Sequence, residues 1–184
     1  MRKTLCFAAL LGALSLSPLA HAEQADRSKP VKITADRVSV DDKNKVQIFE
    51  GSVVLTQGTL TLHADKIVVS QDQDGFQKGV ATSGAGGLAR FRQKREAKSE
   101  YIEGEAERIV YNAKNDTAQL FNRAKVVSGG RDEVSGQYID YDGYNEIYQA
   151  TNGPNATVVS NAKSRVSVTI QPKKSGAKPA ASAP

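Results

Sequence analysis

The feature of this sequence that most limits its fold is a series of short segments in which apolar and polar residues alternate. Residues 31–35, 59–62 and 165–170 all alternate with a period of two, as half-buried strands do. Polar and glycine-containing clusters separate such segments about every 8–15 residues, a spacing typical of β-sandwiches, barrels and jelly rolls. No segment carries the 3.6-residue apolar stripe of an amphipathic helix over three turns. The sequence therefore predicts an all-β domain over residues 31–172.

The domain is also internally repetitive. A small–acidic–basic–aliphatic pattern occurs three times, and the turn at residues 41–44 recurs 71 residues later. From Gln47 onward the offset becomes 72, which pairs Leu55 with Val127. Repeated short-strand units stack into elongated bodies with an apolar interior, whereas a compact sandwich is the alternative. The three copies of the pattern are residues 35–38, 64–67 and 106–109.

Both ends of the chain differ from the domain in composition. Residues 1–22 begin with two basic residues, continue with an apolar run and end in Ala-His-Ala, the arrangement of a secretory signal peptide. We expect cleavage before Glu23, followed by a flexible segment over residues 23–30. Residues 173–184 consist of Lys, Ser, Gly, Pro and Ala, and we expect them to be disordered. The sequence thus predicts an exported, soluble protein.

The net charge of +5 does not describe the domain. Five of the 25 basic residues lie in residues 1–22 and 173–184, which contain no acidic residue, so 20 basic and 20 acidic residues remain between them. A neutral body gives no bulk electrostatic attraction to a polyanion. We therefore expect no nucleic-acid partner.

The expected mature chain offers little to catalysis. It has no cysteine, which excludes a thiol nucleophile and a thiolate metal site, and His63 is its one histidine. Alternation places His63 on the polar face of its strand with the neighbouring threonines. Residues 72–75 lack the ligand pattern of a calcium loop. We expect no catalytic residue, no metal site and no cofactor.

Several short motifs in both halves carry a family resemblance that covers about residues 30–172. They are GSVVLTQG (51–58), ADKIVV (64–69), EGEA (103–106), IVY (109–111), VSG (134–136) and IDY (139–141). On these motifs the chain resembles the LptA family of periplasmic lipopolysaccharide-transport proteins, of the OstA-like β-jelly-roll superfamily. It departs from the family at Ser128-Gly129-Gly130 and in the basic segment 90–95.

The resemblance implies a fold and a function. The fold would be an open-ended, V-shaped β-jelly roll whose two antiparallel sheets enclose a hydrophobic groove. The function would be binding of the acyl chains of lipopolysaccharide in the periplasm of a Gram-negative bacterium. Stacked end to end, such folds would bridge the inner membrane, through LptC, to the outer-membrane LptD–LptE translocon.

Alternation and register place one set of apolar side chains inside the fold, where they are candidates for lipid contact. Phe91 and Tyr111 are the preferred contacts, as large side chains in segments that match the family. Ordinary core packing is the alternative for any single member. The set is Val31, Ile33, Val38, Val53, Leu55, Leu60, Leu62, Phe91, Ile109, Tyr111, Leu120 and Ile139.

The terminal strands and one basic hairpin give two further hypotheses. Terminal strands with a free edge can add a strand from a second copy, which predicts end-to-end self-association. Arg90 and Arg92 share one face of the basic hairpin and are candidate contacts to lipid A phosphates, with a solvated hairpin as the alternative. The interface candidates are Val31, Ile33, Val166, Val168 and Ile170.

A second class of function stays open at this stage. A secreted structural or carbohydrate-binding β-repeat protein with a closed core would share the strand pattern, and it would be a compact monomer indifferent to acylated ligands. Within the superfamily, a role like that of LptC would need a retained membrane anchor, against which the Ala-His-Ala site argues. A role like that of LptD would need a barrel larger than this length allows.

Overall fold

The computed structural model is all β, as the sequence predicts. It describes residues 26, 28–73, 75–84, 87–95, 99–153 and 165–172, except for the side chains of Phe76 and Gln77. The expected signal peptide, half of residues 23–30 and the expected tail lie outside the described residues. The strands are β1 (Lys32–Thr34), β2 (Arg37–Asp41), β3 (Val46–Gln57), β4 (Leu60–Asp72), β5 (Gly75–Thr82), β6 (Ala89–Lys94), β7 (Tyr101–Ala106), β8 (Arg108–Asn112), β9 (Thr117–Ser128), β10 (Asp132–Asp142), β11 (Ile147–Thr151) and β12 (Ser167–Thr169).

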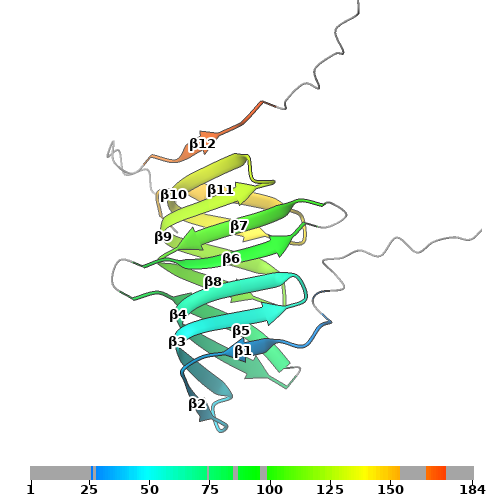
Figure 1. Ribbon diagram of the computed structural model, residues 1–184, viewed down its shortest axis with the longest axis vertical. Helices are drawn as coiled ribbons and strands as arrows, with labels where there is room; N and C mark the ends of the chain where they lie inside the picture. The colour runs from blue at the N-terminus through cyan, green and yellow to red at the C-terminus, as the bar shows by residue number, and fades with distance from the viewer. Residues whose placement is uncertain are drawn as a thin grey trace, which may run out of the picture.

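Four long strands, β3, β4, β9 and β10, each take part in two layers. Residues 66–72 of β4 pair with β5, whereas residues 61–63 pair with β6. In the same way residues 117–121 of β9 pair with β8, and residues 125–128 pair with β7. We call the layer that contains β1, β6, β7 and β12 the front layer, and the layer that contains β2, β5, β8 and β11 the back layer. Figure 1 shows the strands stacked along the long axis, from β2 at one end to β12 at the other.

Backbone kinks carry the long strands from one layer to the other. In β3 the residues Gly51 and Ser52 have φ values of 84° and 45°, and the pairing with β4 shifts register there. In β9 the residues Asn122 and Arg123 have φ values of 61° and 51°. Two successive left-handed residues bend and twist a strand as a β-bulge does. The bulges therefore lie along one side of the molecule, and the hairpin turns of both layers lie along the other side, which we call the turn edge.

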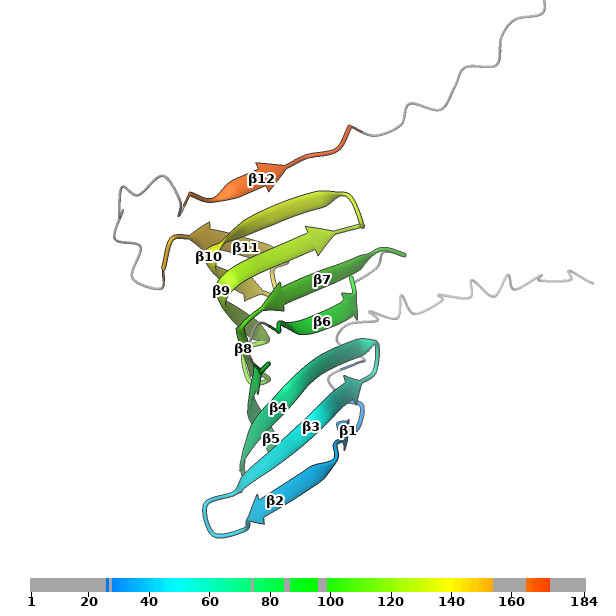
Figure 2. The same cartoon turned by 60° about the vertical axis from the view of Figure 1, so that its left-hand side comes forward.

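Strand pairing closes into a ring of six strands, β4, β5, β8, β9, β7, β6 and back to β4. The expected open-ended V is therefore not confirmed: the pairing describes a flattened, barrel-like ring that β3 and β10 extend at its two ends. Figure 2 shows this extension, with β1 and β2 beyond β3 and with β12 beyond β10. The ring forms because β4 and β9 each provide half of their length to each layer.

The internal repeat is real, but its register differs from the one expected. The bulges at residues 51–52 and 122–123 are 71 positions apart, and the inward-facing Leu55 matches Val126 at the same offset. The extra residue lies later, in the turn 129–131, where the first half has only residues 58–59. The expected match of Leu55 to Val127 is wrong, because a slip of one residue moves a strand side chain to the other face.

Candidate ligand site between the layers

Cross-strand neighbours form an apolar row along the inner face of the front layer. Residues paired across neighbouring strands project to the same face of a sheet. Of this row, Leu55, Leu62, Phe91, Val126 and Val134 are buried in the common core. We call it the front row; it runs Ile33, Leu55, Leu62, Phe91, Gly104, Val126, Val134 and Val168.

The back layer presents two rows to the same interior. The first back row is apolar at every position, and in the second only Gln47 and Gly79 interrupt the apolar side chains. The first back row is Val38, Phe49, Ile67, Ala81, Ile109, Leu120, Ile139 and Ala150. The second back row is Val40, Gln47, Val69, Gly79, Tyr111, Ala118, Tyr141 and Tyr148. Together the three rows line what we call the interior trough, which follows the stack of strands from end to end.

Most of the residues expected inside line this trough or pack against its core. Val53, Leu55, Leu60, Leu62, Phe91, Ile109, Leu120 and Ile139 are buried, and Val31, Ile33 and Tyr111 are partly buried against them. Further residues of the same core were not predicted, among them Phe49, Ile67, Val69, Val126, Val134 and Tyr141. The same two-residue alternation carries the signal for these residues, and Ile67 and Val69 stand in one of the quoted motifs.

Val38 corrects the expectation of burial. Val38 lies on the inner face of the back layer, as expected, because it pairs with Phe49 in the first back row. Its side chain is nevertheless 57% exposed. The reason is its position: β2 is an end strand of the back layer, and among the described residues no further strand covers it. Val40, two residues on, is equally exposed at 56%. The trough therefore ends in uncovered apolar side chains rather than in a polar cap.

The opposite end of the trough has the same character. Val166, Val168 and Ile170 are exposed in and around β12, which pairs with β10 through only three residues. At both ends the terminal strands, β1 and β12, have a strand partner on one side only among the described residues. These are the strand edges that the interface hypothesis requires.

The interior is closely packed at the middle of the molecule. A small cavity of about 30 Å³ lies between the layers, bordered by Leu62, Phe91, Ile109 and Tyr141. Since one water needs about 10–15 Å³ of cavity volume, this cavity admits about two waters and no acyl chain. Passage of an acyl chain through the middle of the trough therefore requires the layers to separate. At the β12 end, a hollow of about 470 Å³ already lies between them, bordered by Val134, Val168, Tyr148 and Ala150.

Polar groups border the cavity on its turn-edge side. Asp116 is buried, with a φ of 50°, and its carboxylate accepts a hydrogen bond of 3.1 Å from the Tyr111 hydroxyl. The Gly143 N–H donates to the Asp116 carbonyl at 2.8 Å, which ties the turn after β10 to the turn before β9. Gln93, at the end of β6, faces the same cavity from the front layer. The trough is thus apolar along its length and polar where its turn edge begins.

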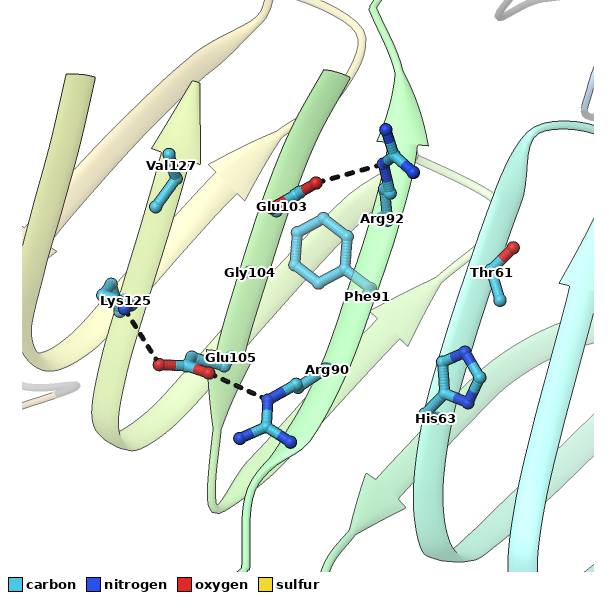
Figure 3. Close-up of a pocket in the computed structure, with 10 residues that line it drawn as sticks. All are labelled: Thr61, His63, Arg90, Phe91, Arg92, Glu103, Gly104, Glu105, Lys125 and Val127. Atoms are coloured by element: carbon cyan, nitrogen blue, oxygen red, sulfur yellow. Dashed lines mark hydrogen bonds and ion pairs between the residues drawn. The ribbon is translucent and has the colours of Figure 1, made fainter. Parts of the chain in front are cut away.

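Phe91 occupies its place in the front row because its neighbour is glycine. A Cβ atom on Gly104 would lie 2.1 Å from Cε1 of Phe91. The aromatic ring therefore covers the Gly104 backbone across the strand pair, as Figure 3 shows. Any larger residue at position 104 would push the ring into the trough.

The two arginines proposed for phosphate contact lie on the outer face of the front layer. Arg90 Nε is 3.0 Å from Glu105 Oε2, and Arg92 Nε is 3.0 Å from Glu103 Oε1. Lys125 Nζ completes the arrangement at 3.2 Å from Glu105 Oε1 (Figure 3). This surface alternates in charge, and it faces away from the trough. Both guanidinium groups are thus paired with carboxylates, and their contact with lipid A phosphates stays a prediction.

No group of three or more His, Cys, Asp or Glu side chains in the described part of the chain is placed to hold a metal ion. No helix within the same residues has the length and hydropathy needed to cross a bilayer.

Comparison with known proteins finds the same fold in named relatives. The family model for the LptA/(LptD N-terminal domain) LPS transport protein matches residues 32–147. The lipopolysaccharide export system protein LptH of Pseudomonas aeruginosa is 30% identical over 158 residues, 86% of this chain and 88% of that protein. LptA of Escherichia coli K12 is 33% identical over 111 residues, 60% of this chain and 59% of that protein.

A solved structure agrees with these matches. It is a crystal structure of LptH of Pseudomonas aeruginosa, described as the LptA-homologous periplasmic component of the lipopolysaccharide transport device. It aligns with a TM-score of 0.71 at 27% identity and covers 80% of this chain and 99% of that chain. Fold and site together define an elongated all-β protein with a continuous apolar interior. The chain belongs to the LptA/(LptD N-terminal domain) LPS transport protein family.

Proposed function

We propose that this chain carries lipopolysaccharide across the periplasm, with the acyl chains held in the interior trough. The observation that supports it most strongly is the set of three inward-facing rows, each with one residue from every strand of its layer. An apolar path that crosses a whole protein suits a long apolar ligand better than a compact one. The role is one of binding and transfer, without catalysis.

Free-energy considerations support an apolar path. Each methylene group that leaves a bilayer for water costs about 0.8 kcal/mol, so about ten methylenes cost about 8 kcal/mol. A continuous trough removes most of that cost along the whole route. Since side chains of similar hydropathy follow one another along each row, a ligand meets no large step in free energy as it slides.

The uncovered ends support transfer between proteins. At one end lie Val38 and Val40 beside the free edge of β1, and at the other lie Val168 and Ile170 beside the free edge of β12. An end strand of one copy added to an end strand of the next would align the rows of both. We propose this heterologous contact for self-association and for the related partners LptC, at the inner membrane, and LptD–LptE, at the outer membrane.

A competition experiment tests the proposed ligand. Purified protein is bound to labelled lipopolysaccharide and challenged with lipid A or with the deacylated oligosaccharide. We expect lipid A to displace the label and the oligosaccharide to leave it bound. Displacement by the oligosaccharide alone would instead support the carbohydrate-binding alternative.

A further inference from the structure

One side chain joins the two layers across the turn edge. Arg95 follows directly after β6 in the front layer, and its Nη2 is 2.7 Å from Oε2 of Glu146, in the turn between β10 and β11 of the back layer. Its Nη1 donates to the Ser128 hydroxyl at 2.9 Å and lies 3.7 Å from Glu100. Arg95 is therefore held by the front layer while it binds a carboxylate of the back layer.

The contact lies beside the cavity of the trough. Gln93, two residues before Arg95, and Tyr141, five residues before Glu146, both border that cavity. The turn that carries Glu146 also carries Gly143, which is bonded to Asp116 on the cavity wall. The Arg95–Glu146 pair thus closes the side of the trough next to the cavity of about 30 Å³.

The environment of the Arg95–Glu146 ion pair favours its formation. The side chains of Arg95 and Glu146 are only 19% and 24% exposed, so water screens their attraction weakly. Burial lowers the pKa of Arg95, but the hydrogen bond and charge of Glu146 outweigh it, and the pKa is raised overall. Charge-assisted bonds of this length are among the stronger ones in proteins.

The two sides of the molecule differ in what joins the layers. On the bulge side, β3, β4, β9 and β10 pass from layer to layer as continuous backbone. On the turn edge, no backbone hydrogen bond between described residues connects the front layer to the back layer. Since the cavity of about 30 Å³ at the middle of the trough cannot admit an acyl chain, the layers must part there for a chain to pass. On the turn edge, side-chain contacts hold the two layers together in the described part of the chain.

We infer that the Arg95–Glu146 pair is a latch on a lateral opening of the trough, and that its release lets an acyl chain enter from the side. The acyl ligand is that of the proposed function, on which this inference rests. The closed latch holds the two layers together beside the central cavity when no lipid is present, and its opening spares the ligand from threading through an end.

The test compares this pair with one of the same chemistry in another place. Arg95→Gln and Glu146→Gln remove the latch, whereas Lys66→Gln and Glu50→Gln remove an ion pair of 3.0 Å within the back layer alone. Association of labelled lipopolysaccharide with the purified protein is followed by stopped flow. We expect the latch variants to load about tenfold faster, the factor that corresponds to losing one charge-assisted hydrogen bond. The control variants should load at the rate of the unmodified protein.

A locked form gives the opposite test. Because the expected mature chain has no cysteine, Arg95→Cys and Glu146→Cys can be joined selectively by a short reducible cross-linker. The cross-linked protein should load about tenfold more slowly, and reduction should restore loading. The exchange Arg95→Glu with Glu146→Arg should load more slowly than either single charge reversal, although Glu100 beside position 95 prevents full recovery. Such recovery separates loss of the latch from loss of the fold.

A readout without lipid separates failure of the latch from failure of the proposed function. Spin labels at Ser99 and Lys114, exposed on front-layer and back-layer turns, report the distance between the layers. Arg95→Gln should broaden that distance distribution even if the protein binds no lipopolysaccharide. An unchanged distribution, or normal loading of the cross-linked form, would overturn the latch. Absence of binding in the unmodified protein would instead overturn the proposed function.

Discussion

Single residues on the outer face set part of the stability of the front layer. Glu105 lies between Arg90 and Lys125, with its carboxylate oxygens 3.0 Å and 3.2 Å from their nitrogens. Burial raises the pKa of Glu105. The hydrogen bonds and charges of Arg90 and Lys125 lower the pKa by more than burial raises it, so the pKa falls below its usual range. A carboxylate whose pKa is lowered by folding stabilises the protein above its unfolded pKa, about 4.3.

This gives a pH-dependent prediction for Glu105→Gln. At pH 7 the variant should be less stable by about 1 kcal/mol, because two charge-assisted hydrogen bonds become neutral ones. As the pH falls through the lowered pKa of Glu105, the original protein loses this advantage and the difference should shrink. Urea unfolding at pH 7 and at pH 3 measures it, with the more exposed Glu103→Gln as the control. A difference that stays constant between the two pH values would contradict the account.

Gly104 gives a second prediction at the same scale. Gly104→Ala should destabilise the protein by about 1–3 kcal/mol, because the new Cβ atom forces the Phe91 ring out of its position. Phe91→Leu in the same chain should recover part of that loss by removing the ring. Gly153→Ala is the matched control, since nothing lies within 4 Å of a Cβ there. Thermal unfolding that shifts equally for Gly104→Ala and Gly153→Ala would be the contrary result.

At the scale of strands, the alternation of apolar and polar residues correctly predicted which side chains face the interior. The reason is that the strand backbone directs successive side chains to opposite faces. Leu60, Leu62 and Phe91 face the trough and His63 faces outward, as their positions in the sequence require. The exchange of partners within long strands was beyond such reasoning. It depends on residues in the left-handed conformation. Asn122 belongs to a residue type that adopts this conformation more often than most, but Ser52 and Arg123 do not. The Arg95–Glu146 contact spans 51 residues and carries no local signal.

The end strands carry the prediction about assembly. Val168→Asp in β12 should raise the concentration at which copies associate about tenfold or more, because a charge would be buried at the junction of two troughs. Thr169→Asp is the matched control, since its side chain is the neighbour on the opposite face of the same strand. Sedimentation velocity over a range of concentrations measures both. Equal effects from both variants would show that the trough is not continuous across the junction.

At the scale of the molecule, the three rows make one structure out of twelve short elements. Each row takes a residue from every strand of its layer, so no single strand defines the trough and no single substitution is expected to remove it. The family resemblance predicted an open groove, whereas the pairing closes a ring around a packed interior. Under the proposed function, the same residues act as a core when the protein is empty and as the lining of the ligand site when the layers part.

Photocross-linking from adjacent residues tests this account most directly. Leu62 and His63 are neighbours on β4, and Phe91 and Arg92 are neighbours on β6, with the first of each pair facing the trough. A photoreactive amino acid is placed at each position in turn, in cells that are exporting lipopolysaccharide. The account predicts lipopolysaccharide adducts from Leu62 and Phe91 and none from His63 or Arg92. Adducts from the outward positions, or equal adducts from both faces, would contradict it.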